Sequence, residues 1–238
     1  MTAIIEAKSL QSINGETINL AIPQNTITVI LGASRSGKSA LLQQLAGVTV
    51  HPKNPTTVCG FETSSLTENT QRELRKRAAY VLPNNALVSN HTIIQNVSLP
   101  LIYHTTLARK DAEQEAERLL ESVGYQGDYK VLPSALTEQQ KRLVNIARNL
   151  ALKPDVVFID EAFAYLDNIA KREFVALYQQ LQAEGLSLVL ATHDSEAAKQ
   201  CGEQFIFIAN EEILFFEDWE NLSRSENQEI THYLARTP

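Results

Sequence analysis

The chain has 238 residues, of which 44% are hydrophobic, enough for one ordinary domain with a substantial core. Its formal net charge of −7 argues against general nucleic-acid binding, because such binding needs clustered Lys and Arg. The strongest apolar runs, 97–103 and 187–191, fall well short of the roughly 20 residues that a membrane-spanning helix needs. The N-terminus lacks a basic segment followed by an apolar one, so we expect no signal peptide and a cytoplasmic location. The two cysteines, Cys59 and Cys201, have no metal or redox spacing, and we expect buried thiols.

The first eighty residues predict strands around one helix. Apolar runs typical of strands occupy 3–7, 17–22, 26–31 and 78–82. Asn14-Gly15 is a turn signal between the first two strands, and a helix is expected to begin near Ser39 and to end at Gly47. Residues 48–67 have little periodicity and predict a loop. The basic run 72–77 is a local cationic patch that we interpret as the solvated face of a helix.

The composition becomes helical between about 83 and 152. Apolar residues recur at helical spacing in two segments, 109–124 and 136–152. An α/β pattern then resumes with a strand at 156–160, a helix near 168–184 and strands at 186–191, 205–209 and 212–216. The polar tail that closes the chain, 217–238, is expected to hold one helix.

The segment GASRSGKS at 32–39 has the form G-x-x-x-x-G-K-S of a phosphate-binding loop, between a predicted strand and a predicted helix. Backbone N–H groups of such a loop point at phosphate oxygens, and the following helix adds its positive N-terminal end. Lys38 is expected to reach the β- and γ-phosphates, and Ser39 to bind Mg²⁺. The predicted nucleotide-binding residues are Gly32, Ser34, Arg35, Ser36, Gly37, Lys38, Ser39 and Ala40. Arg35 occupies a position where glycine is common, so it either restricts the backbone or adds a cation near the phosphates.

Two further apolar strands end in polar side chains. The run VVFI at 156–159 leads into Asp160, expected to orient Mg²⁺, and Glu161, expected to polarise the attacking water. His193 follows the strand at 186–191 and is expected to contact the γ-phosphate and that water. We therefore predict Glu161 and His193 as catalytic, and Ser39 and Asp160 as metal ligands.

These motifs, in this order, resemble the ATP-binding-cassette (ABC) ATPases over nearly the whole chain. The resemblance implies an α/β fold with a P-loop NTPase core, which combines a RecA-like parallel sheet with an N-terminal antiparallel β part, and an inserted helical subdomain. We expect the core at 1–82 and 153–216, the helical subdomain at 83–152, and a C-terminal tail at 217–238. The family binds ATP and Mg²⁺ between two such domains, the phosphate loop of one facing the signature of the other. The chain would then dimerise with itself or with a second ABC ATPase, and Asp167 would lie where the second protomer is met.

Three departures from the family pattern stand out. The usual signature is Leu-Ser-Gly-Gly-Gln, and here the segment 136–140 reads Leu-Thr-Glu-Gln-Gln. Thr137 keeps a hydroxyl that can cap a helix with Gln140 as its capping-box partner, whereas Glu138 and Gln139 place side chains where close phosphate approach needs glycine. Pro83 stands where a glutamine usually follows the preceding strand. No aromatic residue occurs between positions 1 and 30, where the family usually stacks adenine.

Several stretches resemble one branch of the family, the ATPases of Mla-type phospholipid transporters (the MlaF-like branch associated with MCE-domain proteins). These stretches are 74–107, 119–136 and the tail ending in HYLARTP. Lipoprotein-release and cell-division ATPases of the LolD and FtsE kind share the NVSLPL-like stretch and are close alternatives. The resemblance implies membrane permease subunits, a periplasmic lipid-binding component and a small cytoplasmic regulator as partners, no nucleic acid, and a peripheral location on the inner face of the cytoplasmic membrane.

Two functional hypotheses follow from the sequence. In the first, the chain is the ATPase of a lipid transporter and drives a permease by nucleotide-dependent dimer closure, with activity that is weak or partner-dependent because of the degenerate signature. In the second, it is a nucleotide-binding scaffold with little hydrolysis that stabilises a membrane complex. The degenerate signature, the missing glutamine and the missing aromatic residue favour the scaffold, and the joint retention of Lys38, Asp160, Glu161 and His193 favours the ATPase. A soluble ATPase without a permease is a third alternative.

Overall fold

The computed structural model describes residues 2–11, 17–50, 55–210 and 212–236. Near the N-terminus, a four-stranded antiparallel sheet has the order β2-β1-β4-β5. Its strands are β1 (Ala3–Gln11), β2 (Thr17–Pro23), β4 (Thr56–Val58) and β5 (Phe61–Glu62). The turn predicted at Asn14-Gly15 lies outside the described residues. The segment expected to be a loop, 48–67, contributes β4, β5 and a short 3₁₀ helix at Thr63–Ser65.

A second sheet of six strands forms the centre of the molecule, in the order β10-β9-β3-β8-β7-β6. Only β10 runs antiparallel to its neighbour; the other pairings are parallel. The strands are β3 (Ile27–Gly32), β6 (Ala78–Val81), β7 (Val156–Ile159), β8 (Ser187–Ala191), β9 (Gln204–Ala209) and β10 (Glu212–Phe216). Strands β3, β7 and β8 are buried throughout, which matches their nearly continuous apolar sequence.

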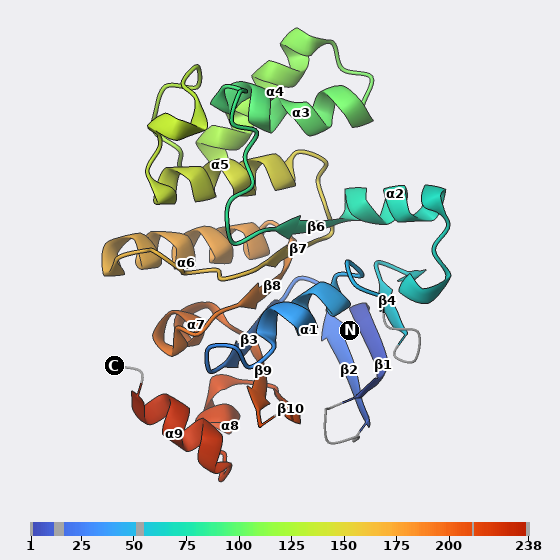
Figure 1. The fold of residues 1–238 in the computed structure, drawn as a ribbon, viewed down its shortest axis with the longest axis vertical. Helices are drawn as coiled ribbons and strands as arrows, with labels where there is room; N and C mark the ends of the chain where they lie inside the picture. The colour runs from blue at the N-terminus through green and yellow to red at the C-terminus, as the bar shows by residue number, and fades with distance from the viewer. Residues whose placement is uncertain (1, 12–16, 51–54, 211, 237–238) are drawn as a thin grey trace.

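Helices cover both faces of the central sheet. Successive residues of β3 pack into different cores, because side chains alternate across a strand. Val29 and Leu31 pack with α6 (Asn168–Ala183) and α7 (Ser195–Cys201), whereas Ile30 packs with α1 (Lys38–Leu45) and the N-terminal sheet. The result is an α/β core in which a mostly parallel sheet lies between helices on both faces, as the sequence predicts (Figure 1).

A group of helices is inserted between β6 and β7 and lies at one end of the molecule (Figure 1). It contains α3 (Ile93–His104), α4 (Arg109–Ser122) and α5 (Glu138–Leu150). The structure thus has the helical subdomain expected between these strands. The N-terminal end of α5 follows from its sequence: Thr137 caps it and Gln140 completes a capping box, as predicted.

The helix predicted from the basic run 72–77 is α2 (Glu68–Arg77), but its face is not simply solvated. Arg75 donates hydrogen bonds to the carbonyls of Ala46 and Gly47, and Arg77 pairs with Asp155 at 2.5 Å. These arginines join α2 to the ends of α1 and β7. Arg75 therefore departs from the interpretation of the run as a solvated face, whereas Arg77 remains exposed.

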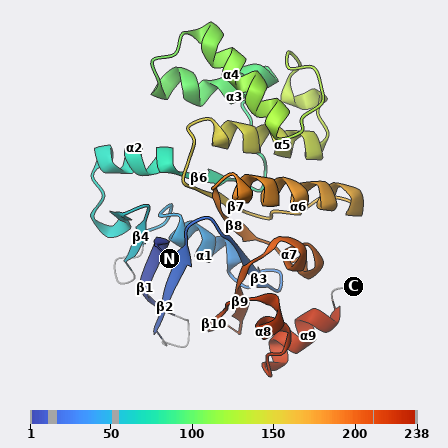
Figure 2. The same ribbon diagram turned by 180° about the vertical axis from the view of Figure 1, so that it is seen from behind.

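The C-terminal tail holds two helices, α8 (Trp219–Ser223) and α9 (Gln228–Arg236), where the sequence predicted one. Both lie beside β9 and β10, at the opposite end of the molecule from α3–α5 (Figures 1 and 2). They are anchored by Leu222 and Ile230, which are fully buried, and by an edge-to-face contact between Phe205 and Trp219. Over the described part of the chain, none of the helices has the length and apolar character needed to cross a membrane.

Candidate nucleotide site

Three segments far apart in the sequence meet at one edge of the central sheet. Strands β3, β8 and β7 are adjacent and parallel, so their carboxyl ends lie together. The phosphate loop follows β3, Asp160 and Glu161 follow β7, and His193 follows β8. The carboxyl edge of a parallel sheet is the usual place for a ligand site in such folds.

The backbone of the phosphate loop needs residues that accept positive φ. Gly37 has φ 99° immediately before α1, and Gly32 has φ 152°. A Cβ on Gly32 would lie 2.8 Å from the Ile208 carbonyl oxygen and 2.7 Å from Ser36 Oγ, so a side chain does not fit there. Arg35 adopts φ 66°, a left-handed conformation that costs a non-glycine residue about 1–2 kcal/mol. Arg35 is exposed, which leaves its guanidinium in solvent beside the loop.

Lys38 lies inside the phosphate loop, with 5% of the residue exposed. Its ammonium donates to the carbonyls of Gly32 at 3.0 Å and Ala33 at 2.7 Å. Burial lowers the pKa of Lys38, and the carboxylates of Glu161 and Asp160 act in the opposite direction. Lys38 is therefore a positive charge held among backbone carbonyls and acidic groups, which is suitable for a phosphate that enters the loop.

Ser39 and Asp160 form an oxygen pair of the kind that Mg²⁺ prefers. Ser39 Oγ donates to Asp160 Oδ1 at 2.9 Å, and the hydroxyl of Tyr80 donates to Asp160 Oδ2 at 3.3 Å. Asp160 is 3% exposed. Mg²⁺ usually takes only one or two protein oxygens, together with waters and substrate phosphates. The described residues contain no cluster of three or more His, Cys, Asp or Glu side chains that could hold a metal, so this pair fits Mg²⁺ with a nucleotide rather than a closed protein cage.

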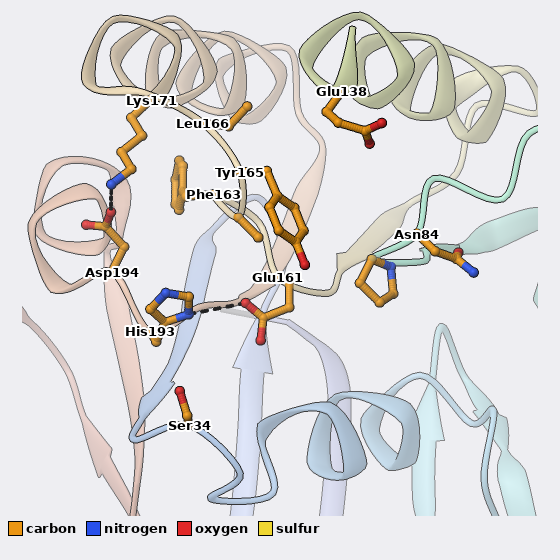
Figure 3. Close-up of a pocket in the computed structure, with 12 residues that line it drawn as sticks. Ser34, Asn84, Glu138, Glu161, Phe163, Tyr165, Leu166, Lys171, His193 and Asp194 are labelled. Carbon is orange, nitrogen blue, oxygen red and sulfur yellow. Dashed lines mark hydrogen bonds and ion pairs between the residues drawn. The ribbon is translucent and has the colours of Figure 1, made fainter. Parts of the chain in front are cut away.

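Glu161 and His193 face one another across the site. His193 Nδ1 lies 3.3 Å from Glu161 Oε2 (Figure 3). Glu161 has φ 51°, an uncommon conformation for a non-glycine residue, and its carbonyl accepts a 2.6 Å hydrogen bond from Arg142 of α5. The carbonyl of His193 accepts a 2.6 Å hydrogen bond from the Tyr233 hydroxyl of α9. The backbone on both sides of this pair is therefore fixed by buried or partly buried side chains from other elements.

A pocket of about 910 Å³ opens between the phosphate loop and α5. Ser34, Glu138, Glu161, Tyr165 and His193 are among its lining residues (Figure 3). Pro83, which stands in place of the family's glutamine, also lines it.

Asp194 borders the same pocket and caps α7 through a 2.9 Å bond to the Ala197 amide. Burial alone would raise the pKa of Asp194, but the Ala197 amide and Lys171, 2.5 Å away, outweigh it and hold the pKa below its usual value. Asp194 is thus a fixed negative charge that holds the start of α7 beside His193.

The segment in the position of the signature has its new side chains engaged within the chain. Glu138 pairs with Lys141 at 2.7 Å and accepts a 3.3 Å hydrogen bond from Asn85. Gln139 donates to Glu173 of α6 at 2.8 Å. The N-terminus of α5 therefore presents a partly neutralised carboxylate, where glycines would leave backbone amides bare.

The remaining predicted residues have simple places. Ala40 is exposed on α1, Ser36 Oγ is buried with no hydrogen-bond partner among the described residues, and Asp167 caps α6 by accepting bonds from the amides of Ile169 and Ala170. Ser36 Oγ is thus a buried polar atom of the loop whose hydrogen bond the described residues do not satisfy. Cys59 and Cys201 are buried, free thiols, as predicted.

Sequence reasoning missed three residues that support the site: Tyr80, Arg142 and Tyr233. Arg142 carried a usable signal, because it lies one turn before the apolar Ile146 of α5 and so on the buried face. No local sequence signal marks Tyr80 or Tyr233, since their hydrogen-bond partners lie 80 and 40 residues away in the sequence.

Comparison with known proteins identifies the family. The family model for ABC transporters matches residues 16–164, more than half of the chain. The chain belongs to the ABC transporter family. Its fold is that of an ABC ATPase cassette, and the enzyme class is ABC ATPase.

Two relatives of this ABC protein differ in how much of each chain they share with it. The methionine import ATP-binding protein MetN of Rhizobium meliloti is 32% identical over 84% of this chain and 56% of its own. The intermembrane phospholipid transport system ATP-binding protein MlaF of Haemophilus influenzae is 27% identical over 97% of this chain and 90% of its own. The ABC protein thus spans about half the length of the MetN relative and nearly all of the MlaF relative.

Solved structures support the fold. The cassette MJ0796 in a dimeric, post-hydrolysis state bound to ADP and Pi matches with a TM-score of 0.80 and 23% identity, over 90% of this chain and 98% of that one. The cbiO1 protein of Clostridium perfringens, part of the ABC transporter complex cbiONQ, matches with a TM-score of 0.82 and 23% identity, over 94% and 92%.

Proposed function

We propose that this ABC protein hydrolyses ATP and so drives a membrane permease that moves phospholipid. The observation that carries the proposal is the set of four chemically matched groups, Lys38, Asp160, Glu161 and His193, at one sheet edge beside the phosphate loop. We further propose the division into a core at 1–82 and 153–216, a helical part at 83–152 and a tail at 217–238, with the core at the cytoplasmic face of the membrane.

In this mechanism, Lys38 and the amides of the phosphate loop bind the β- and γ-phosphates. Ser39 and Asp160, 2.9 Å apart, would hold Mg²⁺, which neutralises phosphate charge and orients the phosphate oxygens when it is bound. Glu161 accepts a proton from the attacking water. His193, 3.3 Å from the Glu161 carboxylate, lies where it can hold that water and the γ-phosphate.

Closure of a dimer would complete the site, with a second copy or a different ABC ATPase as the partner. The exposed loop after Glu161 supports this step, since Tyr165 is 86% exposed and Ile169 63% exposed around the cap of α6. Exposed apolar side chains at this density favour a contact with another protein.

The choice of phospholipid as cargo rests on the share of this chain and of each relative that their alignment spans. The Haemophilus relative, named for intermembrane phospholipid transport, aligns over 97% of this chain and 90% of its own length, whereas the methionine import relatives of Rhizobium meliloti and Wolinella succinogenes align over 56% and 73% of theirs. Near-complete coverage of both chains favours a shared architecture. A periplasmic lipid-binding component and a small cytoplasmic regulator belong to the same proposal.

Steady-state ATP turnover, measured on the purified protein alone and together with the membrane proteins that co-purify with it, tests the proposal. We expect turnover that rises in the presence of the membrane partner. Absence of turnover in both samples, with nucleotide bound, would refute hydrolysis by this chain.

Transport in reconstituted vesicles tests the cargo separately. Labelled phospholipid should move in an ATP-dependent way, and labelled methionine should not. Movement of methionine alone would overturn the choice of cargo and leave the ATPase proposal intact.

A second candidate, a nucleotide-binding scaffold, is favoured by Glu138 at the signature position. Its carboxylate lines the pocket and is only partly neutralised by Lys141, which opposes the approach of a polyanion. The scaffold predicts nucleotide binding without turnover in either sample of the first experiment.

A further inference from the structure

The C-terminal helix α9 lies against the nucleotide site of its own chain. One cavity, of about 830 Å³, is lined by the phosphate-loop residues Ala33 and Ser34, by His193, and by residues of α9 that include His232 and Tyr233. The tail therefore borders both the loop that would bind phosphate and the segment that carries His193, although nothing in the site chemistry described above requires it.

Tyr233 makes the contact that connects the tail to the site. Its hydroxyl donates to the His193 carbonyl at 2.6 Å, and its ring packs edge to face on Phe207 of β9, with centroids 5.1 Å apart and planes at 76°. Phe207 lies on β9, which pairs with β3. Its partner on β3 is Leu31, the residue just before the phosphate loop. The ring thus fixes α9 to the sheet, while the hydroxyl fixes the backbone of His193.

The peptide that joins His193 to Asp194 is held on both of its polar groups, and its amide donates to Thr192 Oγ1 at 3.0 Å. Asp194 is held next to it by the amide of Ala197 and by Lys171, so the segment is fixed on its C-terminal side. The His193 carbonyl accepts its hydrogen bond from Tyr233. Rotation of this peptide would move the imidazole relative to Glu161, 3.3 Å away.

The groups around Tyr233 favour its neutral, donating form. Burial raises the pKa of Tyr233, the negative charges of Asp194 and Glu161 raise it further, and a hydrogen bond with the Gly32 backbone acts in the opposite direction without outweighing them. The surroundings of the hydroxyl therefore favour its protonated form, in which it donates a hydrogen bond.

From this geometry we infer that Tyr233 is a positioning residue for His193, and that docking of α9 sets whether the site is assembled for hydrolysis. The inference rests on the proposed ATPase function for its effect on turnover. It makes the tail a control element: a partner that lifts α9 from β9 would release the His193 segment and lower activity.

Tyr233→Phe tests the inference, because it keeps the ring on Phe207 and removes only the hydroxyl. Tyr103→Phe is the matched control, since Tyr103 is 74% exposed on α3, in the helical part of the chain. Two quantities are measured on each variant: amide hydrogen exchange in the peptide covering 191–195, and the kcat and KM for ATP.

We expect Tyr233→Phe to speed exchange at 191–195 and to lower kcat by roughly three- to tenfold with KM unchanged, the range set by one net hydrogen bond. Tyr103→Phe should change neither. Unchanged exchange in Tyr233→Phe would overturn the inference whatever the turnover, and faster exchange with parental kcat would overturn the positioning role. If the parent itself has no turnover, the proposed function fails, and the exchange comparison alone decides whether Tyr233 holds the His193 segment.

Discussion

Arg142 connects the helix that bears the signature segment to the backbone of Glu161. It is 2% exposed, and its guanidinium donates to the Glu161 carbonyl at 2.6 Å. It also lies against Tyr178, whose hydroxyl donates to the Ala162 carbonyl at 3.1 Å. Replacing Arg142 with methionine keeps most of the side-chain volume and removes every donor, so the change isolates the hydrogen bond from the packing.

The expected loss of unfolding free energy follows from the hydrogen bond between Arg142 and the Glu161 carbonyl. A hydrogen bond from a charged group contributes about 1.5–3 kcal/mol, and the Glu161 carbonyl would keep its 3.0 Å hydrogen bond from the Ala164 amide. For a chain of this size each kcal/mol shifts Tm by about 2–4 °C, so Arg142→Met should lower Tm by about 3–12 °C. The left-handed backbone of Glu161, φ 51°, would lose the shorter of the hydrogen bonds that its carbonyl accepts from Arg142 and from the Ala164 amide, and we expect kcat to fall with KM for ATP unchanged.

Urea unfolding and calorimetry measure the loss, and steady-state turnover measures the effect on the site. Arg172→Met is the control, because Arg172 is exposed on α6 and its loss should stay within about 0.5 kcal/mol. If Arg142→Met unfolds with the free energy of Arg172→Met, the buried bond does not support Glu161 and the reasoning is refuted.

Three further changes test other parts of the site. Ser39→Ala should raise the Mg²⁺ concentration for half-maximal turnover by about ten- to a hundredfold, as seen when a metal site loses a contact; an unchanged Mg²⁺ titration would remove Ser39 from the metal site. Glu138→Gly combined with Gln139→Gly should cost about 2 kcal/mol of unfolding free energy, since each glycine in a helix costs about 1 kcal/mol, yet raise turnover; parental turnover would mean that the signature does not limit hydrolysis. Asp194→Asn keeps the cap of α7 and removes a carboxylate whose pKa is lowered in the fold, so its stabilising effect is complete above the unfolded pKa of about 3.9 and disappears as pH falls through the folded pKa. Urea unfolding should show a deficit of about 0.5–1 kcal/mol at pH 7 that narrows towards zero in acid, and a deficit that is independent of pH would contradict the assignment.

Much of the fold could be predicted because its signals are local. The strands β3, β7 and β8 are continuous apolar runs, and Thr137 and Gln140 form a capping box within four residues. The two tail helices and the strands β4 and β5 were harder, because each is short and depends on packing against the sheet. Tertiary contacts decide such elements more than the sequence around them.

The site residues also divide into those that the sequence predicts and those that it does not. The groups that belong to motifs, Lys38, Asp160, Glu161 and His193, were predicted to meet, because the carboxyl ends of parallel strands share an edge. The groups that hold their backbone were not, since Arg142 and Tyr233 contact residues 19 and 40 positions away. The left-handed φ of Glu161 likewise has no signal in the sequence.

Phosphate release from ATP by the parent protein and by Glu161→Gln, with nucleotide affinity measured on the same samples, tests the central claim most directly. Glutamine preserves the size of the side chain and cannot accept the proton, so turnover should fall by about 10²–10⁴-fold at unchanged affinity for ATP. Equal turnover in the two proteins would contradict the assignment of Glu161 as the residue that activates water.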